Sequence, residues 1–289
     1  MKKILMPVFG LLLCAPAFAQ EAPVSSLRAN LKRAALELSS TSVNHAREYK
    51  DSPNSKLNAD GETVVKGVLD FVLEYEKTNF QWNNGLFMEY GKTTLKPADG
   101  KKTSTENADK ILLTSDYNQK IWNYKGSDIG PFAQLQYQTE FTTDNGVPRT
   151  KTLRGMAGLK LFNGTYVKSL YAGILEEADF TYSKTNMKTA YEIGINLAYP
   201  VRDGVAFSLE SYFRDYMTYS QYEGTNFRYE FNMTSRLDVK LNNKLSIAPY
   251  ISYFRAKDRQ SKVYGSNFMI GISFSYASIF DLFQSSNAE

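Results

Sequence analysis

His45 is the residue best suited to chemistry, because it is the only histidine of the chain and serines lie just before it. Hydrolases pair a histidine base with a hydroxyl nucleophile and a polar group that orients the ring. Ser39, Ser40 and Ser42 are candidate nucleophiles, and Asn44 is adjacent. This pattern allows a hydrolase that acts on lipid or lipopolysaccharide. The simpler interpretation, which we favour, is a solvated histidine at the end of a strand.

The rest of the sequence offers no further chemistry of this kind. Cys14 is the only cysteine, so neither a disulfide framework nor a thiolate metal site can form. We find no glycine-rich phosphate loop, no cluster with metal-ligand spacing and no nucleophile elbow. The sequence therefore predicts a protein without catalytic residues, metal or cofactor.

The first residues predict export. Lys2 and Lys3 precede an apolar run over 4–14, and Ala17-Phe18-Ala19 has the small-x-small pattern of a cleavage site. The run is shorter than the roughly 20 residues that a membrane-spanning helix needs. We therefore expect a signal peptide over 1–19 and a mature chain that begins at Gln20.

The charge of the chain argues against nucleic acid as a partner. The sequence holds 34 basic and 30 acidic residues, a net charge of +4, which is too balanced for a polyanion-binding protein. The mean hydropathy of -0.39 is typical of soluble proteins. A transmembrane barrel, however, carries apolar residues only at every second position, so its average is polar as well.

From residue 63 onward the dominant hydrophobic period is two, which predicts β-strands. The clearest example is 225–237, where apolar side chains alternate with charged and amide side chains. The sequence predicts strands at 63–77, 80–95, 109–117, 129–143, 153–161, 166–181, 188–199, 205–217, 225–237, 245–254 and 267–276. A single-chain bacterial barrel has an even number of strands. We therefore place one more, weaker strand at 34–45.

The connections between the predicted strands alternate in length. Connections after the first, third and later odd strands are mostly longer than the others, as in outer-membrane barrels, where long loops face outward. The exception is 118–128, which is too long for its side. The longer set is 47–62, 92–108, 143–150, 182–187, 218–224 and 256–266, and the shorter set is 78–79, 118–128, 162–165, 200–204 and 242–244.

Strand length and the last strand favour a membrane barrel over a soluble, exported β-rich binding protein. Soluble strands average about 5–6 residues, whereas a tilted membrane strand needs about 9–11. Gly271, Phe274 and Tyr276 resemble the terminal-strand signal of bacterial outer-membrane proteins, which implies the outer-membrane assembly machinery as a partner. Two departures are Met269, where a polar residue is usual, and the 13 residues that follow Tyr276.

Short motifs carry a family resemblance. They are Phe80-Gln81-Trp82-Asn83-Asn84-Gly85-Leu86, Glu89-Tyr90-Gly91, Asp109-Lys110-Ile111 and Tyr117. With these motifs the mature chain resembles outer-membrane barrels of unknown function from Bacteroidetes and related bacteria. In its meander of hairpins it resembles, more distantly, the salt-induced outer-membrane protein family. The resemblance implies a barrel in contact with outer-membrane lipids and lipopolysaccharide, and it implies no catalytic residues.

Charged residues on the other strand face are predicted to line the lumen. Their signs are mixed, so no strong field for one kind of ion is expected. Twelve strands enclose a space between that of filled barrels of about 8 strands and open porins of about 16. The sequence therefore predicts a narrow pore for small solutes or a closed envelope scaffold. The residues are Glu74, Glu89, Glu140, Arg154, Glu192, Glu210, Arg214, Arg228, Glu230 and Arg236, together with Lys66, Asp116 and Lys160.

The predicted organisation is a single all-β domain, an antiparallel up-and-down transmembrane β-barrel of about 12 strands in the bacterial outer membrane. The signal peptide occupies 1–19, a periplasmic lead 20–33, the barrel 34–276 and a periplasmic tail 277–289.

Overall fold

The computed structural model describes residues 25–49, 52, 54, 56–57, 61–95, 103–142, 148–221 and 226–285. The predicted signal peptide lies outside the described residues. Within these ranges no helix is long and apolar enough to cross a membrane.

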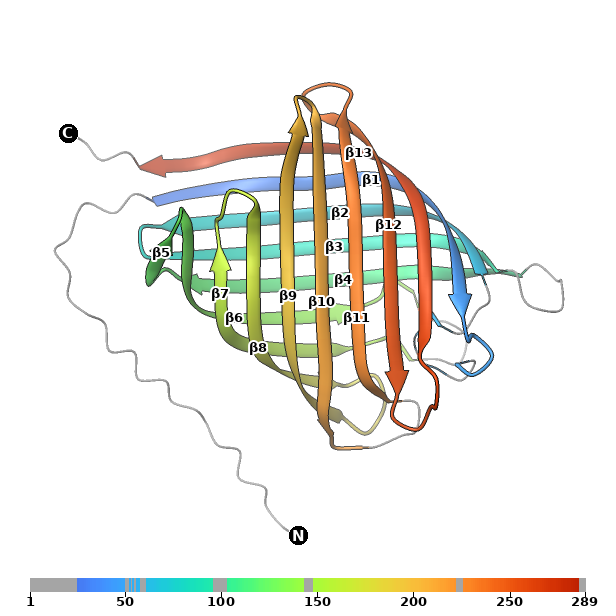
Figure 1. The fold of residues 1–289 in the computed structure, drawn as a ribbon. Helices are drawn as coiled ribbons and strands as arrows, with labels where there is room; N and C mark the ends of the chain where they lie inside the picture. Colours follow the sequence, from blue (N-terminus) through green and yellow to red (C-terminus); the bar gives the residue numbers. More distant parts are fainter. Residues whose placement is uncertain are drawn as a thin grey trace, which may run out of the picture.

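The described chain forms one antiparallel sheet of 13 strands (Figure 1). Pairing between β4 and β6 closes the sheet, so twelve strands form a barrel and β5 is an additional short strand on β6. The predicted fold class and strand number are confirmed. The strands are β1 (Ser25–Asn44), β2 (Gly61–Lys77), β3 (Phe80–Leu95), β4 (Thr103–Gln119), β5 (Trp122–Tyr124), β6 (Ser127–Thr139), β7 (Thr152–Phe162), β8 (Val167–Asp179), β9 (Asn186–Arg202), β10 (Val205–Tyr219), β11 (Phe227–Lys240), β12 (Leu245–Asp258) and β13 (Gly265–Ser285).

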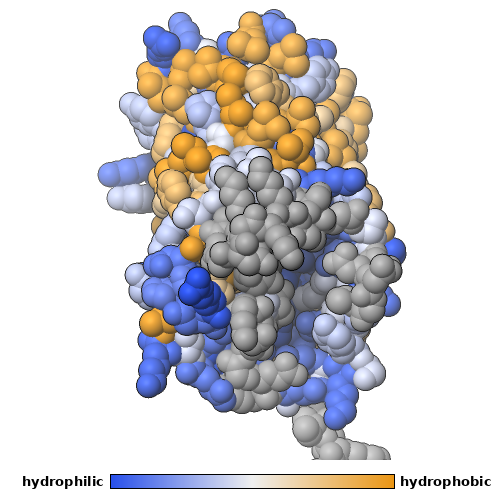
Figure 2. All heavy atoms as spheres, turned by 90° about the vertical axis from the view of Figure 1, so that its right-hand side faces the viewer, coloured by the Kyte–Doolittle hydropathy of each residue, from blue (hydrophilic) through white to orange (hydrophobic). Residues whose placement is uncertain are grey.

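The two-residue period places apolar side chains on the outer surface of the barrel. Leu135, Leu159, Ile193 and Ile270 all have at least half of their surface exposed. Figure 2 shows hydrophobic side chains gathered over the upper part of the molecule and hydrophilic ones over the lower part. The wall of the barrel therefore presents an apolar band to its surroundings.

The connections alternate as predicted. One end, the long-loop end, carries 45–60, 96–102, 140–151, 180–185, 220–226 and 259–264; the other, the short-turn end, carries 78–79, 120–126, 163–166, 203–204 and 241–244. The over-long connection 118–128 is explained by β5, which forms a hairpin with β6. Lys125 and Gly126 both have positive φ there, at 50° and 80°, as a type I′ hairpin turn requires.

Both ends of the barrel chain extend further than the sequence predicts. β1 already begins at Ser25, within the predicted lead, and β13 continues to Ser285, within the predicted tail. Residues 25–31 pair with both 278–285 and 71–77. The boundaries at 34 and 276 are therefore wrong. Register shifts within β1 near Leu31 interrupt the alternation, which hid this part of the strand from the sequence pattern.

Candidate functional site: the lumen and its long-loop mouth

Glu37 joins strands that are not neighbours in the sheet. Its carboxylate lies 3.2 Å from Arg236 Nη1 and 3.6 Å from Lys66 Nζ, and it also accepts a hydrogen bond from Arg33. Arg236 belongs to β11 and Glu37 to β1, with β12 and β13 between them. Lys66 continues the chain of contacts to Glu89 at 2.8 Å. This cluster therefore reaches across the inner face of six neighbouring strands, from β11 through β12, β13, β1 and β2 to β3.

Arg214 forms a second cluster on β9, β10 and β11. Its guanidinium contacts Glu192 at 2.6 Å and Glu230 at 2.9 Å, and all three residues are buried. Tyr171 donates to Glu192 at 2.6 Å, and Tyr216 accepts from Arg214 at 3.2 Å. Buried charges are tolerated when every partner is present, and losing one partner leaves an uncompensated charge.

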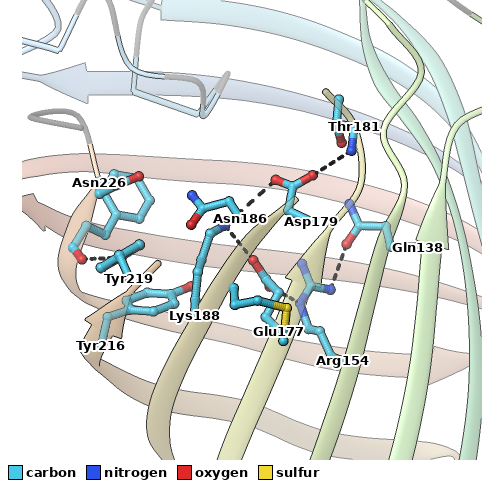
Figure 3. A network of polar contacts seen from close by, with 12 residues as sticks. Gln138, Arg154, Glu177, Asp179, Thr181, Asn186, Lys188, Tyr216, Tyr219 and Asn226 are labelled. Carbon is cyan, nitrogen blue, oxygen red and sulfur yellow. Dashed lines mark hydrogen bonds and ion pairs between the residues drawn. The ribbon is translucent and has the colours of Figure 1, made fainter. Parts of the chain in front are cut away.

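Glu177 is the centre of a third cluster (Figure 3). Figure 3 shows this β8 carboxylate between Arg154 of β7 and Lys188 of β9, with Tyr216 to one side. Lys188 Nζ lies 2.5 Å from Glu177, and Arg154 also donates to Gln138 Oε1 at 2.9 Å. The two cations thus share one buried carboxylate.

Lys160 forms a fourth cluster that passes over a strand. It lies on β7 and contacts Asp116 at 2.7 Å and Asn118 at 2.9 Å, both on β4. The intervening strand β6 contributes Phe132, whose ring centroid is 4.9 Å from Lys160 Nζ. The ammonium group is therefore held by a charge, an amide and an aromatic face together.

Most of the predicted lumen charges take part in such contacts. Glu74 pairs with Arg28 at 3.0 Å, and the others belong to the clusters above. The residues that the structure places in interior ion pairs are Glu74, Glu89, Arg154, Glu192, Arg214, Glu230 and Arg236, with Lys66, Asp116 and Lys160.

Three predicted residues do not belong to these clusters. Arg228 is exposed and lies at a register shift between Phe227 and Tyr229, which interrupts the alternation of β11, so its place in the lumen stays a prediction. Glu140 follows the end of β6 and accepts from the backbone of Thr150 at 3.0 Å. Glu210 shares the inner face of β10 with Arg214 but is exposed.

The sequence pattern missed three members of the clusters, Glu37, Glu177 and Lys188. Glu37 lies in β1, whose alternation is weak, and Glu177 lies in β8, whose two faces both carry apolar residues. Opposite charges at cross-strand positions were the available signal, since Glu177 is directly opposite Lys188 in the ladder.

Gly271 of the predicted terminal-strand signal has a packing role. A Cβ at this position would lie 2.5 Å from Tyr250 Cζ and 2.7 Å from the carbonyl oxygen of Leu38. The ring of Tyr250 therefore lies across Gly271 on the inner wall. Phe274 is exposed on the outer face. The ring centroid of Tyr276 lies 6.0 Å from Lys244 Nζ at the short-turn end.

Described residues of the connection after β1 pack against the barrel wall at the long-loop end. We call its described residues, 45–49, 52, 54, 56 and 57, the mouth segment. Tyr49 is 1% exposed and Leu57 0%, and both pack with Phe254 and Ala256 of β12. Gly265 at the start of β13 leaves room for them, since a Cβ there would lie 3.1 Å from both side chains.

Polar contacts fix the mouth segment on the same two strands. Tyr49 donates to the carbonyl of Val263 at 2.9 Å and accepts from the backbone N–H of Asp258 at 3.3 Å. Asn267 donates to the carbonyl of Lys56 at 2.9 Å. Segment and wall are thus joined by both apolar and polar contacts.

Lys56 carries a charge into the lumen. Its Nζ lies 5.0 Å from the ring centroid of Phe254, and burial lowers its pKa below that of an ordinary lysine. Glu89 on β3 and Glu230 on β11 are close enough to oppose this shift in the pKa of Lys56. Since β3 and β11 are separated by four strands on one side of the barrel, Lys56 lies between two different parts of the wall.

His45 begins the mouth segment and has a φ of 61°. Its ring meets the ring of Tyr264 edge-on, with centroids 6.1 Å apart. Its Nδ1 atom is buried and finds no hydrogen-bond partner among the residues of the described ranges. The geometry does not assemble the serine–histidine pair that the sequence allowed.

One family model matches part of the chain. Residues 57–144, which include every motif of the family resemblance, match the model of a family described as a protein of unknown function (DUF3078). No curated protein matches the chain.

Solved structures show which fold this is. The COG4313 outer membrane channel of Pseudomonas putida F1 is similar over 90% of this chain and 97% of its own, with 11% identity and a TM-score of 0.50. The channel DcaP of Acinetobacter baumannii covers 91% and 100% with 6% identity and a TM-score of 0.42. Outer membrane phospholipase A of Escherichia coli covers 83% and 89% with 9% identity and a TM-score of 0.41. The chain has the fold of an outer-membrane β-barrel.

Proposed function

We propose that this chain is a bacterial outer-membrane protein, exported by its signal peptide, whose barrel forms a narrow passage for small solutes that is closed in the conformation seen here. The observation that carries the proposal is the set of four ion-pair clusters on the inner wall, beneath a mouth segment that folds inward. The finer relationship, to barrels of unknown function from Bacteroidetes, remains part of this proposal.

The outer surface supports a membrane location. A soluble barrel turns its apolar face inward, whereas here large apolar side chains such as Leu159 and Ile270 are exposed and charged ones are inside. Exposed apolar surface of this extent marks contact with a membrane or partner. This arrangement favours outer-membrane lipids and lipopolysaccharide as the surroundings, and it does not favour a soluble exported binding protein. The terminal strand β13 carries the residues Gly271, Phe274 and Tyr276, whose resemblance to a terminal-strand signal supports the outer-membrane assembly machinery as a partner.

The inner wall supports a narrow passage. Each cluster pairs acids with bases at hydrogen-bond distance, so little net field for one ion sign remains. Arg214, Glu192 and Glu230 are buried, which places packed side chains where an open porin would hold water. Glu210, which is exposed on the same face, lies nearer the short-turn end.

A lipid hydrolase centred on His45 is not supported, because the ring contacts Tyr264 and its Nδ1 has no hydroxyl partner within the described chain. We therefore propose a non-enzymatic role.

Two measurements on the purified protein test the proposal. Folded membrane barrels migrate anomalously on gels when unboiled, so we expect heat-modifiable migration after detergent extraction. In planar bilayers we expect small, infrequent conductance steps. Equal migration of the boiled and the unboiled protein would contradict the membrane barrel. Heat-modifiable migration without any conductance would replace the pore by a closed envelope scaffold.

A further inference from the structure

The mouth segment is attached to the barrel differently from the rest of the long-loop end. Tyr49 and Leu57 are almost wholly buried, whereas Tyr182 in the connection 180–185 at the same end is 65% exposed. A buried aromatic and a buried leucine are what anchors a segment, because each withdraws apolar surface from water. The mouth segment is therefore seated on the wall, and its seat consists of Phe254, Ala256, Val263, Gly265 and Asn267.

A buried charge opposes this seating. Asp258 of β12, which is 7% exposed, has an Oδ1 atom without a hydrogen-bond partner in the described residues. An unpaired buried carboxylate oxygen is costly, and leaving the seat would let water reach it. The apolar contacts and this charge thus act in opposite directions, which makes seating reversible.

We infer that the mouth segment is a removable plug, which covers the lumen when it is seated on β12 and β13 and opens the lumen when it leaves. The plug itself depends only on the seating contacts. Its effect on solute passage rests on the proposed pore.

Covalent labelling tests the plug without relying on conductance. Cys14 is the only cysteine and lies in the predicted signal peptide, so an introduced cysteine reports alone. Ala256→Cys places a thiol at a position that is 0% exposed beneath Tyr49 and Leu57. A bulky maleimide is added to the folded, detergent-solubilised protein. Ser183→Cys, in an exposed loop at the same end, gives the rate for an uncovered thiol.

Leu57→Ala in the Ala256→Cys background removes a seating contact without altering a barrel strand. We expect the labelling rate to rise at least about tenfold, since truncating a buried leucine costs more than the free energy of one factor of ten. Tyr49→Phe, which keeps the ring and loses the hydroxyl contacts to Val263 and Asp258, should raise it by a smaller factor. Tyr182→Ala is the matched control and should leave the rate unchanged.

The outcomes separate the plug from the pore. If Leu57→Ala both speeds labelling of the Ala256→Cys thiol and gives larger or more frequent conductance steps, the plug and the proposed pore are both supported. Faster labelling without conductance supports the plug and overturns the proposed pore. Labelling of heat-modifiable, folded Leu57→Ala protein at the rate of the Tyr182→Ala control overturns the plug, whatever the conductance.

Discussion

The ion-pair clusters and the mouth segment use opposite means to fill the same barrel. In the Arg214 cluster, charges from three neighbouring strands are buried and each finds a partner within 3 Å. In the mouth segment, Tyr49 and Leu57 pack on an apolar seat, beside which Asp258 is buried with an unpaired carboxylate oxygen. Contacts built into the wall cannot be lost without weakening the barrel, whereas contacts made by a connection can be exchanged for water. We therefore expect substitutions in the ion-pair clusters to lower the stability of the whole barrel. Substitutions in the mouth segment should change only how firmly that segment is seated.

The largest effect is expected from Arg214→Ala. It leaves Glu192 and Glu230 buried without their cation, which costs about 3–5 kcal/mol in comparable buried pairs. Equilibrium unfolding in urea, followed by tryptophan fluorescence, measures this loss. Arg228→Ala is the matched control: Arg228 is exposed on β11, and we expect a change within about 0.5 kcal/mol. Equal losses for the two variants would contradict the assignment of Arg214 to a stabilising cluster.

A smaller global effect is expected from Gly271→Ala. The added methyl group meets the Tyr250 ring and the Leu38 carbonyl, and overpacking of this kind costs about 1–3 kcal/mol. The midpoint of heat-induced gel shift reports the loss. Gly155→Ala on β7 is the control, because a Cβ there meets no atom within 4 Å. If Tyr250→Leu does not restore part of the stability of Gly271→Ala, the ring is not the obstacle.

The smallest effect is expected from Lys56→Met, and it is opposite in sign. Burial lowers the pKa of Lys56, so the protonated side chain opposes seating at neutral pH, and this cost would shrink as the pH rises toward the ordinary lysine value. Methionine keeps the length of the side chain and removes the charge. In the Ala256→Cys protein at constant pH we expect labelling to slow several-fold, with the urea midpoint unchanged. Faster labelling would show that the attraction to Glu89 and Glu230 outweighs desolvation.

The sequence by itself determined which side chains face outward and which face inward over most strands. Alternation is a property of neighbouring residues, so Leu135 and Ile193 could be assigned to the outer face without knowing which strands pair. The same reasoning separated the long-loop end from the short-turn end. It failed over 25–33, where register shifts break the period of two, and a further shift interrupts the alternation of β11 at Arg228.

Only the tertiary structure decided which charges meet and what fills the mouth. Arg236 reaches Glu37 across two intervening strands, and Lys160 reaches Asp116 across one, because closure of the tilted sheet sets their relative height along the wall. The seat of Tyr49 and Leu57 likewise joins residues that are about 200 positions apart in the chain. Local patterns specify the faces of a strand, while contacts between distant strands depend on the stagger of the whole barrel.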